Sequence, residues 1–161
     1  MEELQIKKKI ILLDSIESIE KELMNLKDTK IITFDYVSHK SLLKSEIEHE
    51  ISDDFLDKQE YQYIQKKSMS LTKWYDGELS KFLEYEKVNL GRLFYVEFHH
   101  YLLQILKKIL ETKKIVKELQ DVDLIASPKL FNIVKEFYPS VTLFDIKIEE
   151  KDDFLDDSIK F

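Results

Sequence analysis

The chain begins with two short, continuous apolar runs separated by a stretch of helical periodicity. The runs are residues 9–14 (KIILLD) and 30–35 (KIITFD), and uninterrupted apolar runs of this length indicate strands buried on both faces. Between them, Asp14 and Glu17 have the spacing of a capping box, and apolar residues then recur at helical spacing, at Ile16, Ile19, Leu23 and Leu26. This alternation predicts the opening of a doubly wound parallel α/β sheet.

The later pattern predicts three more strands, at about 47–51, 123–126 and 141–146. Ser38 is the expected cap of a short helix with Leu42 and Leu43, and Ser127-Pro128 opens another, since proline is favoured at the first helical position. Right-handed crossovers make 3-2-1-4-5 the economical strand order, as in a Rossmann-like fold. The predicted core residues are Ile11, Leu13, Ile32, Phe34 and Ile125.

About seventy residues separate the third and fourth predicted strands, far more than one crossover helix needs. Residues 58–74 have helical periodicity with Tyr61, Ile64 and Leu71 inward, a break follows at 75–77, and residues 89–119 form a second helical pattern. Unbroken, that second helix would span about 45 Å. We therefore expect a single α/β domain, 1–161, with a helical insertion at about 57–120. Because such a helix overhangs the sheet, its apolar face could meet the helices of residues 58–83, a C-terminal domain or a second copy of the chain. Of these we expect a homo-oligomer through residues 89–119.

Composition excludes several function classes. The 161 residues carry a net charge of -7 and a single arginine, Arg92, which disfavours nucleic-acid binding and bidentate phosphate clamps. With no cysteine, disulfides, thiolate metal sites and thiol catalysis are excluded. No apolar stretch reaches the roughly 18 residues of a membrane span, and the N-terminus is not a signal peptide. We expect a cytoplasmic protein.

The turn after the first predicted strand reads Leu13-Asp14-Ser15, where a dinucleotide-binding fold needs glycines. No nucleotide cofactor is therefore expected. Ligands of open α/β sheets bind beyond the carboxyl ends of the strands, so the candidate site residues lie there. Asp14 serves there as a helix cap or as a ligand contact. The full set is Asp14, Ser15, residues 35–39 including His39, Ser127, Lys129 and Asp145.

Further candidates lie in the insertion. Glu97 and His100 are spaced to share a helix face, where they form either a solvated surface or a general-base pair beside a cleft. Glu46 and His49 have the same Glu-x-x-His spacing, but a di-iron site needs four long helices, so no metal is expected. Trp74, at a helix-to-loop transition, either plugs the junction between insertion and sheet or stacks on a sugar ring.

Several segments together resemble a known protein class. They are Ile10-Ile11-Leu12-Leu13-Asp14, Phe34-Asp35, residues 48–56 (EHEISDDFL), residues 71–75 (LTKWY) and residues 88–94 (VNLGRLF). They resemble the N-terminal Rossmann-like region of prokaryotic surface-carbohydrate biosynthesis proteins with GT-B glycosyltransferase architecture. The resemblance implies an acceptor-side domain, with the nucleotide sugar bound by a C-terminal domain, so that this chain alone would be inactive as an enzyme.

The last residues leave a second interpretation open. An acidic run at 149–153 is followed by apolar residues up to Phe161, which is expected if the chain is the N-terminal part of a longer protein. The alternative is a stand-alone α/β interaction module that assembles through its long helix. The reading frame beyond Phe161 distinguishes the two, because a second Rossmann-like half favours the transferase and a stop codon favours the module.

Overall fold

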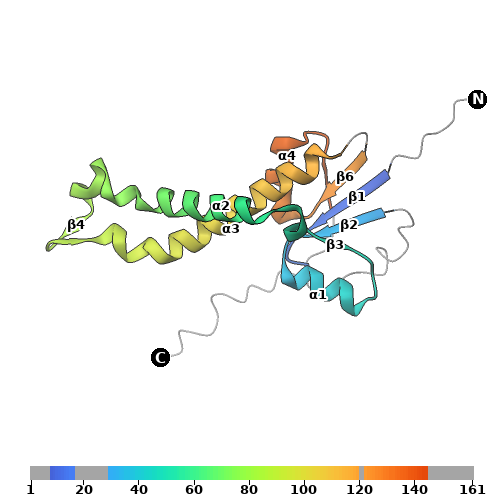
Figure 1. Cartoon of the computed structure of the whole chain (residues 1–161), viewed down its shortest axis with the longest axis horizontal. Helices are drawn as coiled ribbons and strands as arrows, with labels where there is room; N and C mark the ends of the chain where they lie inside the picture. Colours follow the sequence, from blue (N-terminus) through green and yellow to red (C-terminus); the bar gives the residue numbers. More distant parts are fainter. Residues whose placement is uncertain (1–7, 17–28, 120–121, 145–161) are drawn as a thin grey trace, which may run out of the picture.

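A parallel sheet of five strands lies at one end of the structure, a computed structural model that describes residues 8–16, 29–119 and 122–144 (Figure 1). The strand order β3-β2-β1-β6-β7 confirms the predicted α/β class and the predicted order 3-2-1-4-5. All four strand pairs are parallel. The strands are β1 (Lys8–Leu13), β2 (Thr29–Thr33), β3 (Glu50–Ile51), β6 (Val122–Ala126) and β7 (Thr142–Leu143).

β1 is the central strand and is covered on both faces. Ile11 is paired in register with Ile31 of β2 and with Ile125 of β6. Four of the predicted core residues are buried, and Ile125 is partly buried against one of the two core clusters. The continuous apolar run in the sequence therefore reflects a strand with a hydrophobic layer on each side.

Helices cover the two faces of the sheet separately. One face packs against α4 (Pro128–Phe137) and the C-terminal part of α3 (Tyr95–Lys117), with Ile115, Leu130 and Val134 in the shared core. The other face packs against α1 (Tyr36–Lys44) through Leu42. The sheet is thus the middle of three layers in the described part of the chain.

The start of α1 corrects one sequence expectation. Its cap is Asp35 rather than Ser38, because the Asp35 side chain accepts the backbone N–H of Ser38 at 3.1 Å. The Ser38 hydroxyl is buried inside the helix and accepts the N–H of Ile16 at 2.9 Å. The helix predicted before β2 and the end of the last predicted strand, with Asp145, fall on residues 17–28 and 145–146, outside the described residues.

The insertion between β3 and β6 forms a helical arm that extends away from the sheet (Figure 1). α2 (Lys58–Leu71) follows the short turn η2 (Ser52–Phe55) and leads outward, and α3 returns to the sheet beside it. The distal connection contains three 3-10 turns and a two-stranded antiparallel hairpin. These are η3 (Thr72–Asp76), η4 (Glu78–Phe82), β4 (Glu84–Tyr85), β5 (Val88–Asn89) and η5 (Leu90–Phe94).

The long helix begins later than its periodicity predicted. α3 starts at Tyr95, so it is about 35 Å long rather than 45 Å. The preceding segment forms the 3-10 turn η5, in which the Asn89 side chain accepts the N–H of Gly91 at 2.9 Å. Gly91 is needed here because a Cβ atom would lie 2.4 Å from the Cβ of Tyr75. On α2, Ile64 is buried as predicted, whereas Leu71 is exposed.

Candidate functional site

The carboxyl ends of β1, β2 and β6 meet at one edge of the sheet. The N–H of Phe34 donates to the carbonyl of Leu13 at 2.8 Å, and the N–H of Ser127 donates to the carbonyl of Leu12 at 2.9 Å. These two bonds continue the strand pairing beyond the strands. The residues that follow, Asp14, Asp35 and Ser127, are thereby brought to the same edge, where open α/β sheets bind ligands.

The turn after β1 directs three consecutive backbone N–H groups at side chains of this chain. The N–H of Asp14 donates to Ser127 Oγ at 3.0 Å, that of Ser15 to Asp35 Oδ2 at 3.0 Å, and that of Ile16 to Ser38 Oγ. Ser15 has φ 61°, the left-handed region that glycine usually supplies. In a phosphate-binding turn such N–H groups face the ligand. Here all three are occupied internally.

The Asp14 carboxylate is almost fully buried and carries an ion pair. Its Oδ1 accepts the Ser15 hydroxyl at 3.0 Å, and its Oδ2 is paired with the ammonium of Lys108, from α3. Asp14 is 2% exposed, whereas the Lys108 side chain is 23% exposed. A ligand at this edge therefore meets Lys108 and the half-buried Ser15 first. The N–H of Ile16, the second residue after Asp14, is bound by Ser38 rather than by Asp14.

Lysines of α3 hold Lys108 in position by attaching the helix to its surroundings. Lys107 pairs with Asp53 of η2, and Lys114 Nζ donates to Glu60 of α2 at 2.6 Å and to the carbonyl of Phe55 at 3.0 Å. The hydrogen bond from Lys114 lowers the pKa of Glu60. The sheet end of the arm is thus held by charged contacts that precede and follow Lys108 along α3, at Lys107 and at Lys114.

These groups suit a ligand rich in hydroxyls better than a phosphate. Asp14, Asp35 and the serine hydroxyls are hydrogen-bond acceptors, and the two carboxylates would repel a phosphoryl group. Lys108 is the cation at the edge, and its charge is already offset by Asp14. Among the described residues, no group of three or more His, Cys, Asp and Glu residues could hold a metal ion.

The predicted site residues are only partly assembled here. The structure brings Asp14 and Ser127 together through a hydrogen bond, as their positions at two strand ends implied. Lys129 is exposed in the first turn of α4. Sequence reasoning missed Lys108, which lies 94 residues from Asp14 along the chain. The available signal was a pair of lysines inside the apolar pattern of a long helix.

His39 is turned toward another histidine. Its Nδ1 lies 2.8 Å from His49 Nε2, and His49 Nδ1 lies 2.8 Å from the carbonyl oxygen of Ile47. Since a carbonyl only accepts, His49 carries its proton on Nδ1, and in the neutral pair His39 donates from Nδ1. The two unprotonated nitrogens are then His49 Nε2, which accepts this bond, and His39 Nε2. No pattern in the sequence indicates that these two residues meet.

The other three candidates lie on the arm. Glu97 and His100 are exposed on α3, in its half remote from the sheet. Trp74 is 41% exposed in η3, beyond the distal end of α2, and its ring meets that of Tyr75 edge-on. The expectation that Trp74 plugs the junction between insertion and sheet is therefore wrong. Its exposure leaves the ring available for stacking.

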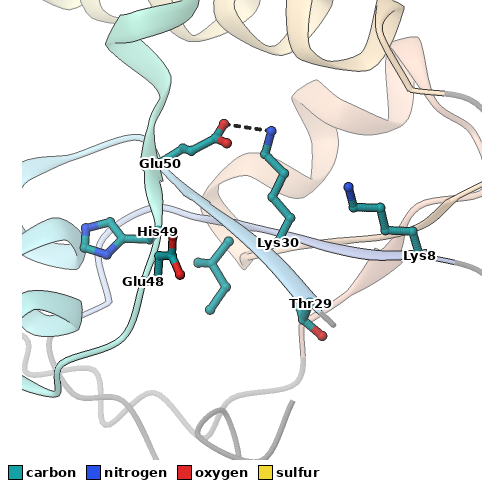
Figure 2. Close-up of a pocket in the computed structure, with 7 residues that line it drawn as sticks. Lys8, Thr29, Lys30, Glu48, His49 and Glu50 are labelled. Carbon is teal, nitrogen blue, oxygen red and sulfur yellow. Dashed lines mark ion pairs between the residues drawn. The ribbon is translucent and has the colours of Figure 1, made fainter. Parts of the chain in front are cut away.

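A pocket of about 540 Å³ lies at the opposite edge of the sheet (Figure 2). Its lining includes Lys8 at the start of β1, Thr29 at the start of β2, and the Lys30–Glu50 ion pair of 2.7 Å. Figure 2 shows the ring of His49 pointing away from Lys30 and Lys8. Because this pocket lies at the amino ends of the strands, it is separate from the edge formed by Asp14 and Ser127.

The fold and the edge together define a Rossmann-like α/β domain whose first turn is closed by its own side chains. The chain matches no protein-family model, and comparison with curated proteins and with solved structures also found no match. None of the helices in the described residues is long and apolar enough to cross a membrane.

Proposed function

We propose that the chain is the acceptor-side domain of a GT-B-like glycosyltransferase of surface polysaccharide biosynthesis. The observation that carries the proposal is the turn after β1, whose N–H groups at Asp14, Ser15 and Ile16 are bound by other side chains. Such an edge offers polar groups but has no free backbone N–H groups at this turn to bind a diphosphate. This suits the acceptor half of a GT-B enzyme, in which the nucleotide sugar is bound by the other half.

The chemistry of the edge supports an oligosaccharide as the ligand. Sugar hydroxyls both donate and accept hydrogen bonds, and the partly exposed groups at the edge, the Lys108 ammonium, the Ser15 hydroxyl and the Asp35 carboxylate, can serve as partners for both. In the proposal Lys108 and Ser15 contact the acceptor, while Asp14 and Ser127 position them. A C-terminal domain supplies the nucleotide sugar, so the chain alone lacks transferase activity. The enzyme acts in the cytoplasm, where nucleotide sugars are the donors.

A binding assay with matched variants tests this proposal. Saturation-transfer NMR on the chain uses bacterial capsular oligosaccharides as one panel and UDP-, GDP- and CMP-sugars as the other. The double variant Asp14→Asn/Lys108→Met removes both charges together, so neither is left buried without its partner. We expect it to lose oligosaccharide signals, and the control Lys30→Met, beside the pocket at the opposite edge, to keep them. Binding of nucleotide sugars with no oligosaccharide signal would contradict the proposal.

The alternative function, a non-catalytic interaction module, is favoured by a different observation. Large apolar side chains of residues 66–101, the distal arm, are exposed, among them Phe82, Tyr85, Phe94 and Tyr101. Surfaces of this kind mark sites of association. A transfer assay of the longer protein separates the two functions. If it is an enzyme, alanine variants at the remaining candidate residues should lower its transferase activity without changing its melting temperature; these residues are His39, Lys129, Trp74, Glu97 and His100. If it is an interaction module, neither the natural protein nor the variants should show transferase activity.

A further inference from the structure

The distal arm, residues 66–101, exposes apolar side chains that the rest of the described chain does not cover. Seven of them, from η4, β4, β5, η5 and the first half of α3, are each more than half exposed. They are Phe82, Tyr85, Val88, Leu93, Phe94, Val96 and Tyr101. Exposed residues of this size are unremarkable when scattered singly, but a concentration on one protruding element indicates a docking surface.

Part of this surface is a helix face with the spacing of a coiled-coil seam. Phe94, the last residue before α3, and Phe98, Tyr101 and Ile105 of α3 follow one another at intervals of four, three and four residues, and the rings of Phe98 and Tyr101 are stacked with centroids 6.5 Å apart. This spacing places side chains along one helix face that packs against a second helix. α2 does not fill this role, because it meets the neighbouring face, where Ser68 Oγ bonds His99 Nδ1 at 2.8 Å.

The exposed area approaches the area that each partner buries in a stable pair of proteins. An aromatic side chain can bury about 150–250 Å², so Phe82, Tyr85, Phe94 and Tyr101, at 62–86% exposed, leave on the order of 500 Å² in solvent. Leu93 and Val96 add to this. A standard interface takes about 800 Å² from each partner, which the distal arm can therefore approach without help from the sheet.

Charge favours a second copy of the chain as the occupant. The distal arm has six lysines and arginines against five aspartates and glutamates, a net of +1. Both signs are interspersed on the arm, which allows self-complementary pairing. Because its net charge is close to zero, the arm does not repel a second copy of itself.

We propose that two copies associate through their distal arms into an antiparallel four-helix bundle about a two-fold axis near Phe98. Each copy contributes α2 and α3, and Phe94 of one copy faces Tyr101 of the other across the axis. Such a pairing is isologous and closes at two copies. The inference deepens the interaction function proposed above and is independent of the glycosyltransferase proposal, since it leaves the Asp14 edge uncovered.

Sedimentation equilibrium of the full chain tests the association. We expect a dimer, and we expect Phe94→Lys/Tyr101→Lys to raise its dissociation constant by more than ~100-fold, with an unchanged circular dichroism spectrum. The control Tyr36→Lys, at a 72% exposed residue of α1, should stay dimeric. A chain that stays monomeric at high concentration, or a lysine double variant that stays dimeric, would overturn the proposal.

The absence of cysteine allows a direct test of the orientation. In the antiparallel bundle Phe98→Cys should form a disulfide with its own copy, whereas Phe94→Cys and Tyr101→Cys should cross-link only when the two variants are mixed. Self-cross-linking of Phe94→Cys would overturn the antiparallel arrangement. A monomeric chain that binds phosphatidylglycerol vesicles through Phe82 and Tyr85 would assign the distal arm to a membrane surface instead.

Discussion

Glu111 provides a quantitative test of how the arm is joined to the sheet. Its side chain is fully buried on α3 beside η2, and neither carboxylate oxygen accepts a hydrogen bond in the described structure. Burial raises its pKa from 4.5 to about 7, the charge of Lys107 opposes this rise, and Asp53 adds to it. Lys107 Nζ is 3.5 Å away, but Lys107 is also paired with Asp53. Glu111 is thus an acid whose ionised form is poorly compensated.

The free energy follows from the difference between folded and unfolded pKa. One pKa unit corresponds to about 1.4 kcal/mol, so ionising Glu111 at high pH costs the folded state about 3 kcal/mol. Because the folded pKa is raised, the folded state binds the proton more tightly. The contribution to stability is therefore fully present below pH 4.5 and is lost as the pH rises through about 7.

The perturbation is Glu111→Gln, which keeps the shape and removes the titration. Urea unfolding followed by circular dichroism should show that the free energy of unfolding of the variant, relative to that of the natural chain, rises by about 2.5 kcal/mol between pH 5 and pH 8. For the control Glu118→Gln, at the exposed end of α3, the free energy of unfolding should change with pH in parallel with that of the natural chain. A constant difference between Glu111→Gln and the natural chain across this range would refute the reasoning.

Three further outcomes are expected. Ile11→Asp places an unpaired charge in the core and should cost roughly 3–5 kcal/mol, abolishing the cooperative thermal transition; a natural melting temperature would mean that β1 is misassigned. Gly91→Ala should lower the melting temperature, since its Cβ meets Tyr75, whereas the control Gly77→Ala, with 3.8 Å to the nearest atom, should not; equal effects would contradict the packing. Calorimetry should detect no micromolar binding of NAD, FAD or ATP, because the N–H groups after β1 are occupied; such binding would show that the turn reopens.

The central fold was predictable because its signals are local. The run around Ile11 is continuous only because both faces of β1 are covered, and the order of the strands follows from right-handed crossovers with few alternatives. The predicted cap of α1 lies three residues too late, because Asp35 and Ser38 are both residue types that cap helices well. Asp35 accepts the backbone N–H of Ser38, whereas the Ser38 hydroxyl accepts the backbone N–H of Ile16 from another segment, a contact that no local pattern reveals.

The site and the arm were less predictable because they depend on tertiary contacts. Lys108 reaches Asp14 only because α2 and α3 fold back on the sheet, and no local pattern records that path. α3 begins only after the 3-10 turn in which Gly91 lies against Tyr75, although the apolar periodicity runs through that turn without a break. Trp74 was assigned to the junction because its sequence position does not reveal how far α2 extends from the sheet.

The central claim, that the turn after β1 belongs to an acceptor site and not to a nucleotide site, is tested most directly by amide NMR. The labelled chain is titrated with capsular oligosaccharides and, separately, with UDP-, GDP- and CMP-sugars, while the N–H signals of Asp14, Ser15 and Ile16 are followed. We predict that these signals shift with an oligosaccharide and stay in place with every nucleotide sugar. Shifts caused by a nucleotide sugar, with none caused by an oligosaccharide, would contradict the account.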